Sequence, residues 1–246
     1  MTTIPARQRA ARYAVGYTVG LAETAADMRE AQRLRHQVFA EEMGARLDTP
    51  ITGLDVDPLD AYGDHLLVRH GEGGEVVGTH RLLSPRRADR LYADSTFDLR
   101  PLAGVRPDMV EAARACVRSD HRCGAVIGLM WAAIARYVVA GGHRWVAGCC
   151  SVPVSGVAGV DEVMRRLPLC PPEYRVTPRL PWRGSRRRRV EAATVPAPLR
   201  GYARLGAWVC GPPAHNPDLG TADFFVLLSM ANLNPRYRRH FLGAPA

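Results

Sequence analysis

The spacing of apolar positions along the chain predicts both helices and strands. After Gly124 the apolar residues recur at i, i+3, i+4 and i+7 until Gly141-Gly142, which predicts a long helix that the glycines end. The residues from Thr24 to Val38 repeat this spacing, so we expect a second helix with Thr24 just before it. By contrast, 109–117 and 145–152 are short apolar runs of the kind that form buried strands.

A β-hairpin is predicted at 64–83, because the apolar runs on either side of Gly71-Glu72-Gly73-Gly74 are joined by a short glycine loop. Residues 13–19 and 222–228 have strand composition, and 199–207 reads as a helix. The order is β-α-loop-β-β-β-α-β, an irregular excursion, an α segment and a β strand. It predicts an α/β fold with a mixed central sheet flanked by helices, rather than regular Rossmann alternation.

We expect residues 1–246 to form a single domain. Within it, 153–197 differs in composition, because it is rich in proline and carries a basic run at Arg183 and Arg186–Arg189. We interpret this segment as an insertion or lid.

The charged residues of the chain exclude some kinds of catalysis and favour some kinds of partner. Its 33 basic residues outnumber its 24 acidic residues, for a formal charge of +9, and all of the basic residues are arginine. The absence of lysine excludes Schiff-base and lysine-base chemistry. Arginine grips carboxylates and phosphates with two N–H groups, so an anionic partner is expected: an acidic protein, a phosphate-bearing cofactor, anionic lipid or nucleic acid.

The cysteines and the N-terminus indicate a compartment. The six cysteines form no C-x-x-C pair and no zinc-like spacing with histidine, so we expect reduced thiols and no metal site. No apolar run is long enough for a signal peptide or a membrane span. The prediction is a cytoplasmic protein, with a peripheral position at the inner membrane face as a further option.

One segment has the character of an anion seat. Arg122-Cys123-Gly124-Ala125-Val126 opens the long predicted helix, where unpaired backbone N–H groups and the helix dipole favour a phosphate. The segment resembles the R-x-x-G-x-G/A loop of the GCN5-related N-acyltransferase superfamily, through Arg122, Gly124 and Ala125. A simple helix start is the alternative.

Several separated blocks extend this resemblance. They are 34–45, 64–68, 76–83, 124–127, 201–207, 220–228 and 236–243. Together they resemble the ornithine-lipid branch of that superfamily, the ornithine Nα-acyltransferases that take a 3-hydroxyacyl chain from acyl carrier protein. The acyl-homoserine-lactone synthases are more distant relatives. The chain departs from the family at 111–116, where Glu-Ala-Ala-Arg-Ala-Cys replaces Glu-Leu-Gly-Arg-Ser-Cys.

The resemblance implies a reaction and a donor site. Acyl transfer to an amine requires a base, and Glu111 is the expected one; the alternative is that Glu111 only pairs with Arg114 or Arg81. The donor is the phosphopantetheine arm of acyl carrier protein or a coenzyme A thioester, with no tightly bound cofactor. Backbone groups near Cys116 and Val117 would receive the pantetheine arm, and the helix mouth at 122–126 its phosphate.

The resemblance also implies an acceptor site for a small amine or amino acid. Its candidate residues are Arg35, Glu41, Glu42, Asp64, His65 and Arg81. For the charges at 35–42, a solvated helix face is the competing explanation. For Asp64 and His65, a buried aspartate that orients the histidine competes with a pair that only caps the loop.

Several alternatives to this mechanism, partner and function remain open at this point. Cys149-Cys150 allows a covalent thiol mechanism, although direct acyl transfer and core packing fit the apolar strand better. The arginine run suits an acidic carrier protein or an anionic bilayer better than nucleic acid, because few aromatics accompany it. One alternative is an enzyme of specialised metabolism that acylates another amine. The other is a protein that binds anions and has no catalytic activity.

Overall fold

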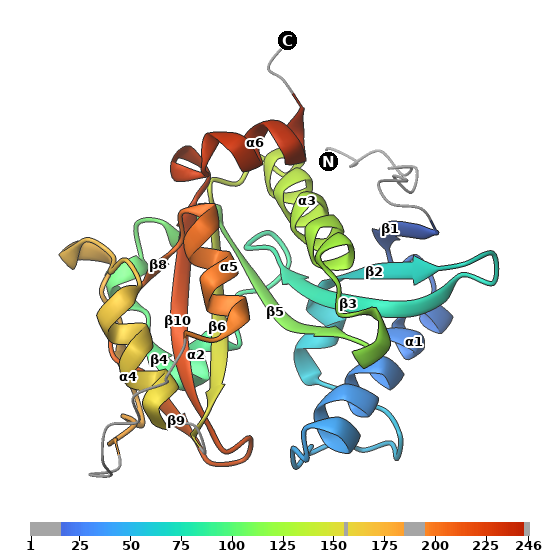
Figure 1. The fold of residues 1–246 in the computed structure, drawn as a ribbon, viewed down its shortest axis with the longest axis horizontal. Helices are drawn as coiled ribbons and strands as arrows, with labels where there is room; N and C mark the ends of the chain where they lie inside the picture. Colours follow the sequence, from blue (N-terminus) through green and yellow to red (C-terminus); the bar gives the residue numbers. More distant parts are fainter. Residues whose placement is uncertain (1–15, 155–156, 185–194, 244–246) are drawn as a thin grey trace. The chain divides into compact units, whose positions relative to one another are not determined.

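The computed structural model describes residues 16–154, 157–184 and 195–243 (Figure 1). Contacts divide the chain into two compact units. The first comprises the described residues up to Leu82 together with Arg114–Tyr137, and the second Leu83–Ala113 together with the described residues from Val138 onward. The expected single domain stays a prediction. Arg186–Arg189 lie outside the described residues.

The first unit is built on an antiparallel hairpin with a third strand beside it. β2 (Asp64–His70) pairs with β1 (Tyr17–Leu21) on one edge and with β3 (Glu75–Leu83) on the other. In the register of β2 and β3, Leu67 lies opposite Thr79 and His65 lies opposite Arg81. The predicted hairpin is therefore confirmed.

Two helices cover opposite faces of this hairpin. α1 (Ala25–His36) begins at Thr24, whose hydroxyl accepts from the Asp27 N–H while the Asp27 carboxylate accepts from Thr24 N–H. It continues as a π-helical turn, η1 (Gln37–Glu42). Leu34 and Val38 pack with Leu67 on one face, whereas α3 (Gly124–Ala140) packs Val126 and Met130 against the other. Figure 1 shows α1 and α3 on either side of β2 and β3.

β5 (Met109–Val117) runs from the second unit into the first. Among the described residues, Arg114 is the one non-glycine residue with a positive φ, 54°. The left-handed conformation is unfavourable for a residue with a Cβ. It occurs at the residue where β5 enters the first unit.

The second unit holds the parallel part of the sheet. Met109–Glu111 of β5 pair in parallel with Trp145–Ala147 of β6 (Trp145–Pro153), and β6 pairs along its whole length with antiparallel β10 (Thr221–Ser229). The remaining short strands are β4 (Phe97–Asp98), β7 (Thr177–Pro178), β8 (Trp208–Val209) and β9 (Ala214–Asn216). Parallel and antiparallel pairs occur together, so the predicted mixed sheet is confirmed.

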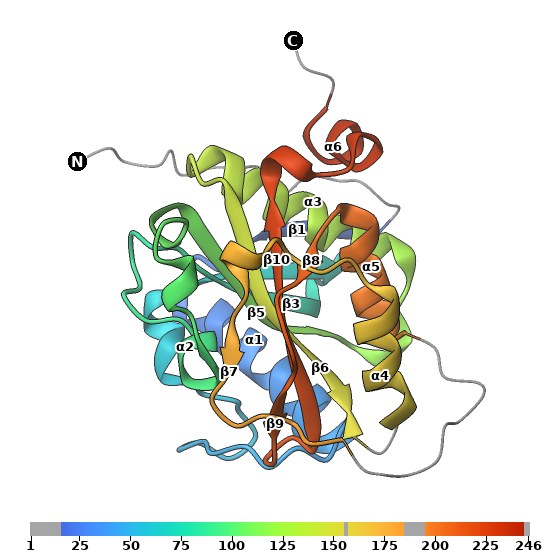
Figure 2. The same cartoon turned by 90° about the vertical axis from the view of Figure 1, so that its left-hand side faces the viewer.

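α4 (Val157–Arg166) and α5 (Ala197–Leu205) cover one face of β6 and β10 (Figure 2). Val160 and Val163 of α4 and Leu199 of α5 share a buried cluster with Phe224. The sequence analysis expected an irregular excursion at 153–197. That expectation was wrong for α4, which packs its valines into the core.

Two more helices complete the described chain, α2 (Ala93–Thr96) and α6 (Pro235–Leu242). The short 3-10 turns used below are η2 (Pro58–Tyr62) and η5 (Ser119–His121). Within the described residues, no helix has the length and apolar character needed to cross a membrane.

Candidate active site

The segment predicted to bind an anion lies at the start of α3. The helix begins at Gly124, so the N–H groups of Gly124, Ala125 and Val126 belong to its first turn and have no acceptor inside the helix. A Cβ on Gly124 would meet no atom within 4 Å, so the backbone is approachable there. Cys123, just before the helix, is exposed.

Arg122 already has partners at this mouth. Its Nε donates to the Val117 carbonyl at 2.9 Å, and its Nη2 pairs with the Glu42 carboxylate. The guanidinium is nevertheless about half exposed, at 47%. The structure thus joins a residue predicted for the donor, Arg122, to one predicted for the acceptor, Glu42.

Glu41 lies apart from these residues. Its side chain is 63% exposed and contacts His36 at 3.1 Å. Of the explanations offered for the charges at 35–42, the solvated helix face therefore describes Glu41. It does not describe Arg35, which is fully buried.

A buried cluster of charges occupies the face of the hairpin that α1 covers. Arg35 Nη1 and Nη2 lie 3.0 and 2.6 Å from the two oxygens of Asp60, and Arg35 Nε lies 2.9 Å from Asp55 Oδ2. Arg81 Nη1 donates to Asp57 at 2.7 Å and to Asp60 at 3.0 Å. Arg114 adds an ion pair with Asp57 at 2.8 Å.

These contacts keep the carboxylates ionised. Burial opposes ionisation of Asp60, but hydrogen bonds from Arg35 and Gln32 and the charge of Arg81 hold its pKa well below the usual value. Burial also opposes ionisation of Asp57, and the charges of Arg81 and Arg114 likewise hold its pKa low. Three arginines thus meet three aspartates, and two of these, Asp57 and Asp60, have lowered pKa values.

The sequence analysis missed the aspartates of this cluster. Asp55, Asp57 and Asp60 lie in a Pro-, Gly- and Asp-rich segment that shows no helical or strand period. The signal that was available is the spacing Asp55-x-Asp57-x-x-Asp60 directly before a predicted strand, because charges beside a buried strand need partners.

His65 faces this cluster, and Asp64 does not. Neighbouring residues on a strand point to opposite faces, so Asp64 cannot orient His65 as predicted. Asp64 instead accepts from the Tyr137 hydroxyl at 2.7 Å. The aspartate beside His65 is Asp60, whose backbone oxygen lies 3.3 Å from His65 Nε2, and burial lowers the pKa of His65.

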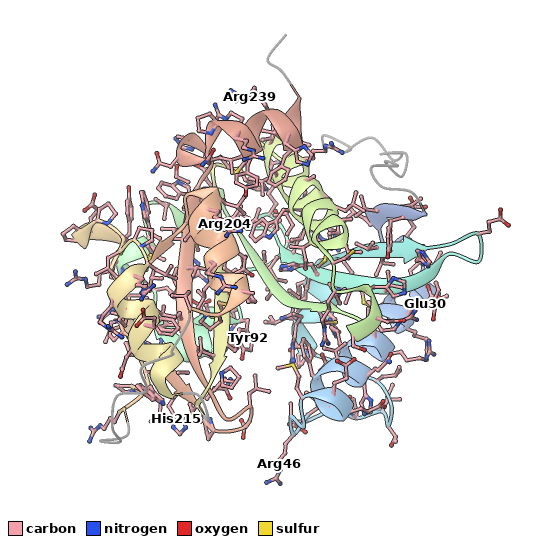
Figure 3. The ribbon with its side chains drawn as sticks, viewed as in Figure 1. Glu30, Arg46, Tyr92, Arg204, His215 and Arg239 are labelled. Atoms are coloured by element: carbon pink, nitrogen blue, oxygen red, sulfur yellow. The ribbon has the colours of Figure 1, made fainter. Side chains whose placement is uncertain are left out.

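Glu111 lies in the second unit and is fully buried. Its two oxygens accept hydrogen bonds from the backbone N–H groups of Tyr92, at 2.7 Å, and Ala93, at 2.9 Å. Figure 3 labels Tyr92. Glu111 therefore anchors the start of α2, and its role as a base stays a prediction.

The remaining residues predicted to bind the acyl donor, Cys116 and Val117, lie at the end of β5. Cys116 is buried against α1, and burial raises the pKa of its thiol to about 12. The Val117 carbonyl accepts from Arg122, so one of the backbone groups expected to meet pantetheine is engaged by a side chain.

In the second unit, burial raises the pKa of Cys149 well above its usual value and that of Cys150 to about 12. Thiols held protonated are poor nucleophiles, which disfavours the covalent cysteine mechanism.

Among the described residues, no cluster of three or more His, Cys, Asp or Glu side chains is arranged to hold a metal ion.

Comparison with known proteins assigns the chain to a class of enzyme. Residues 34–132 match the acetyltransferase (GNAT) domain family. Solved structures with a similar fold include the coenzyme A-dependent acyl-homoserine lactone synthase BjaI, at TM-score 0.55 and 21% identity over 90% of this chain and 85% of that one. The N-acyl amino acid synthase FeeM, from uncultured soil microbes, has TM-score 0.55 and 11% identity over 88% of this chain and 94% of that one. The protein is a GNAT-type N-acyltransferase.

Two named relatives indicate a more specific family within this class of enzyme. The L-ornithine N(alpha)-acyltransferase of Rhodobacter capsulatus is 30% identical over 92% of this chain and 95% of that protein. The enzyme of the same name from Brucella abortus is 29% identical over 93% and 89%. The chain belongs to the family of L-ornithine N(alpha)-acyltransferases.

Proposed function

We propose that this enzyme transfers a (3-hydroxy)acyl chain from an acyl carrier protein thioester to the α-amine of ornithine. The observation that carries the acceptor is the identity with L-ornithine N(alpha)-acyltransferases, 30% over nearly the whole of both chains. The donor rests on the helix mouth and on the excess of arginine over acidic residues, which suits the acidic surface of a carrier protein.

The reaction requires few steps. The neutral α-amine attacks the thioester carbonyl, the C–N bond forms, and the tetrahedral intermediate collapses with loss of the pantetheine thiol. Glu111 is the proposed acceptor of the ammonium proton, directly or through water. The raised pKa values of Cys149 and Cys150 support direct transfer over an acyl-cysteine intermediate.

The first-turn amides of α3 are the proposed seat of the pantetheine phosphate. An anion there is stabilised by the unpaired N–H groups and the positive end of the helix dipole. Arg122, half exposed beside these amides, adds a permanent positive charge. The proposed place of action is the cytoplasm, at its membrane face if the product is a lipid.

The test is a transfer assay with purified protein. Carrier-protein thioesters of several chain lengths are incubated with ornithine and other amines, and mass spectrometry detects carrier release and the acylated amine. Acyl-coenzyme A serves as the competing donor. Release of the carrier with Nα-acylornithine as product is expected. Equal efficiency with acyl-coenzyme A removes the carrier-protein claim, and no transfer to any amine favours the non-catalytic anion-binding module.

A further inference from the structure

Within the described residues, one edge of the buried Arg81 guanidinium has no hydrogen-bond partner. Arg81 is fully buried, and its Nη1 is occupied by Asp57 and Asp60. Its Nε and Nη2 are buried as well, yet neither finds a hydrogen-bond acceptor in the part of the chain that the structure describes. These two atoms form the side of a guanidinium whose parallel N–H groups match the two oxygens of a carboxylate.

His65 presents an unpartnered atom on the same face. A carbonyl oxygen can only accept, so His65 Nε2 carries the hydrogen in its contact with the Asp60 backbone oxygen. Burial lowers the pKa of His65, which leaves the ring neutral and Nδ1 with a free lone pair. Nδ1 is buried and has no hydrogen-bond partner among the described residues.

The strand register brings these two groups together. His65 and Arg81 are directly opposite each other on β2 and β3, so their side chains leave the same face of the hairpin. Thr79, two residues before Arg81 on that face, has a third buried and unpartnered group, its hydroxyl. Buried polar groups are almost always hydrogen-bonded, so three groups without a hydrogen-bond partner on one face of the hairpin are consistent with a site for a polar ligand.

The charge of the surroundings restricts that ligand. The neighbouring cluster is balanced, with three arginines against three aspartates: Arg35, Arg81, Arg114, Asp55, Asp57 and Asp60. A simple carboxylate would leave one uncompensated negative charge at a buried site, which is unfavourable. A ligand that carries its own amine beside its carboxylate avoids this penalty.

We propose that Arg81 and His65 form the headgroup site for the acceptor's α-amino acid group. Arg81 Nε and Nη2 bind the α-carboxylate as a two-pronged pair, His65 Nδ1 accepts a hydrogen bond from the α-amine, and the Thr79 hydroxyl lies beside them. This inference rests on the proposed function and deepens it, because it makes the carboxylate a requirement of the acceptor.

The first experiment compares ornithine with ornithine amide, which lacks only the carboxylate charge. The amide has the less basic and more easily deprotonated amine, so poorer use of it reflects recognition. We expect wild-type kcat/KM to favour ornithine by about 100-fold or more. Arg81→Lys, which keeps the charge but loses the parallel N–H pair, should reduce this preference to within about 5-fold.

Arg35→Lys is the matched control, because Arg35 is equally buried but has carboxylate contacts at Nε, Nη1 and Nη2. It should lower the melting temperature, as Arg81→Lys does, and keep the preference for ornithine. Wild-type use of both acceptors within about 3-fold would overturn the proposal. So would an equal loss of preference in both variants, since that outcome reports a loosened cluster rather than a lost ligand contact.

The His65 contact is tested by two substitutions that separate its nitrogens. His65→Gln places an amide near Nε2 and keeps the bond to the Asp60 carbonyl, whereas His65→Asn places its amide oxygen near Nδ1. We expect the Gln variant to raise the ornithine KM about 10-fold and the Asn variant to raise it less. A Gln variant with wild-type KM contradicts the His65 contact.

Calorimetric titration of ornithine into the protein, in the absence of acyl donor, measures ornithine binding without acyl transfer. It therefore tests the headgroup site independently of the proposed function. Binding of ornithine that Arg81→Lys abolishes supports the site even if no acyl transfer is found. Transfer to ornithine without a carboxylate preference overturns the site and leaves the proposed function intact.

Discussion

Arg122 and Glu42 form an ion pair that joins the mouth of α3 to the π-helical turn after α1. The pair holds the guanidinium on the side of Glu42, while the first-turn amides of α3 lie next to Arg122 in the chain. In the proposed function, Glu42 and the pantetheine phosphate would therefore compete for the Arg122 guanidinium.

This competition gives opposite predictions for the two partners. Arg122→Ala should raise the KM for a small pantetheine thioester about 10-fold, because a charge-assisted contact to the phosphate is lost. Glu42→Gln should lower that KM, since it releases the guanidinium. Steady-state kinetics with the pantetheine donor measures both. If Glu42→Gln raises the KM as Arg122→Ala does, the pair serves the fold and not the donor.

Glu111→Gln should lower turnover about 10²–10⁴-fold if Glu111 is the base. The same change also turns an amide NH₂ toward a backbone N–H of α2, which costs about 1–3 kcal/mol of stability. Asp94→Asn is the control, because Asp94 lies in the same short helix, accepts from the Leu91 N–H at 2.8 Å and pairs with Arg106. Its melting temperature should fall while turnover is kept. A Glu111→Gln enzyme within threefold of wild type would end the assignment.

Stability should fall on acidification in two stages. Burial lowers the pKa of His65, so below about pH 6.5 the unfolded chain binds a proton that the folded chain resists. The pKa values of Asp57 and Asp60 are lowered too, so their contribution is present above about pH 4 and is lost as the pH falls further. Urea unfolding between pH 8 and 2 checks the sign of both stages. His65→Gln should reduce the upper stage without abolishing it, because burial lowers the pKa of His143 as well. A rise in stability toward pH 5 would contradict the argument.

Cys123 should be the first thiol to react with iodoacetamide in the folded protein. It is exposed, whereas Cys116, Cys150, Cys170 and Cys210 are buried. Mass spectrometry of the alkylated protein identifies the site. Because Cys123 precedes the helix mouth, a saturating pantetheine thioester should slow its alkylation. Equal labelling with and without the thioester would argue against a donor seat there.

The sequence predicted the elements whose local signals agree with their packing. The helix from Gly124 to Ala140 has a regular apolar period and ends at a glycine pair, and the structure gives these bounds. The Thr24 cap and the hairpin at 64–83 were confirmed for the same reason. In the predicted site, Arg35, His65 and Arg81 do lie on one buried face.

The features that the sequence did not predict depend on contacts between segments far apart in the chain. Asp60 binds Arg35 and Arg81 across 25 and 21 residues of sequence, and no local pattern encodes such partners. The proline-rich composition around 157–166 concealed α4, whose valines are buried only through β6 and β10. Glu111 was singled out for chemistry, but its hydrogen bonds to Tyr92 and Ala93 follow from the tertiary fold alone.

At Arg114 the backbone conformation and the side-chain ion pair favour different residue types. Glycine would adopt its φ of 54° without strain, but glycine has no guanidinium to meet Asp57. Arg114→Gly would thus relax a local backbone tension and at the same time leave Asp57 held by Arg81 alone of these two arginines. The backbone conformation at Arg114 and its ion pair with Asp57 therefore cannot be improved independently, so substitution of Arg114 is expected to be tolerated poorly.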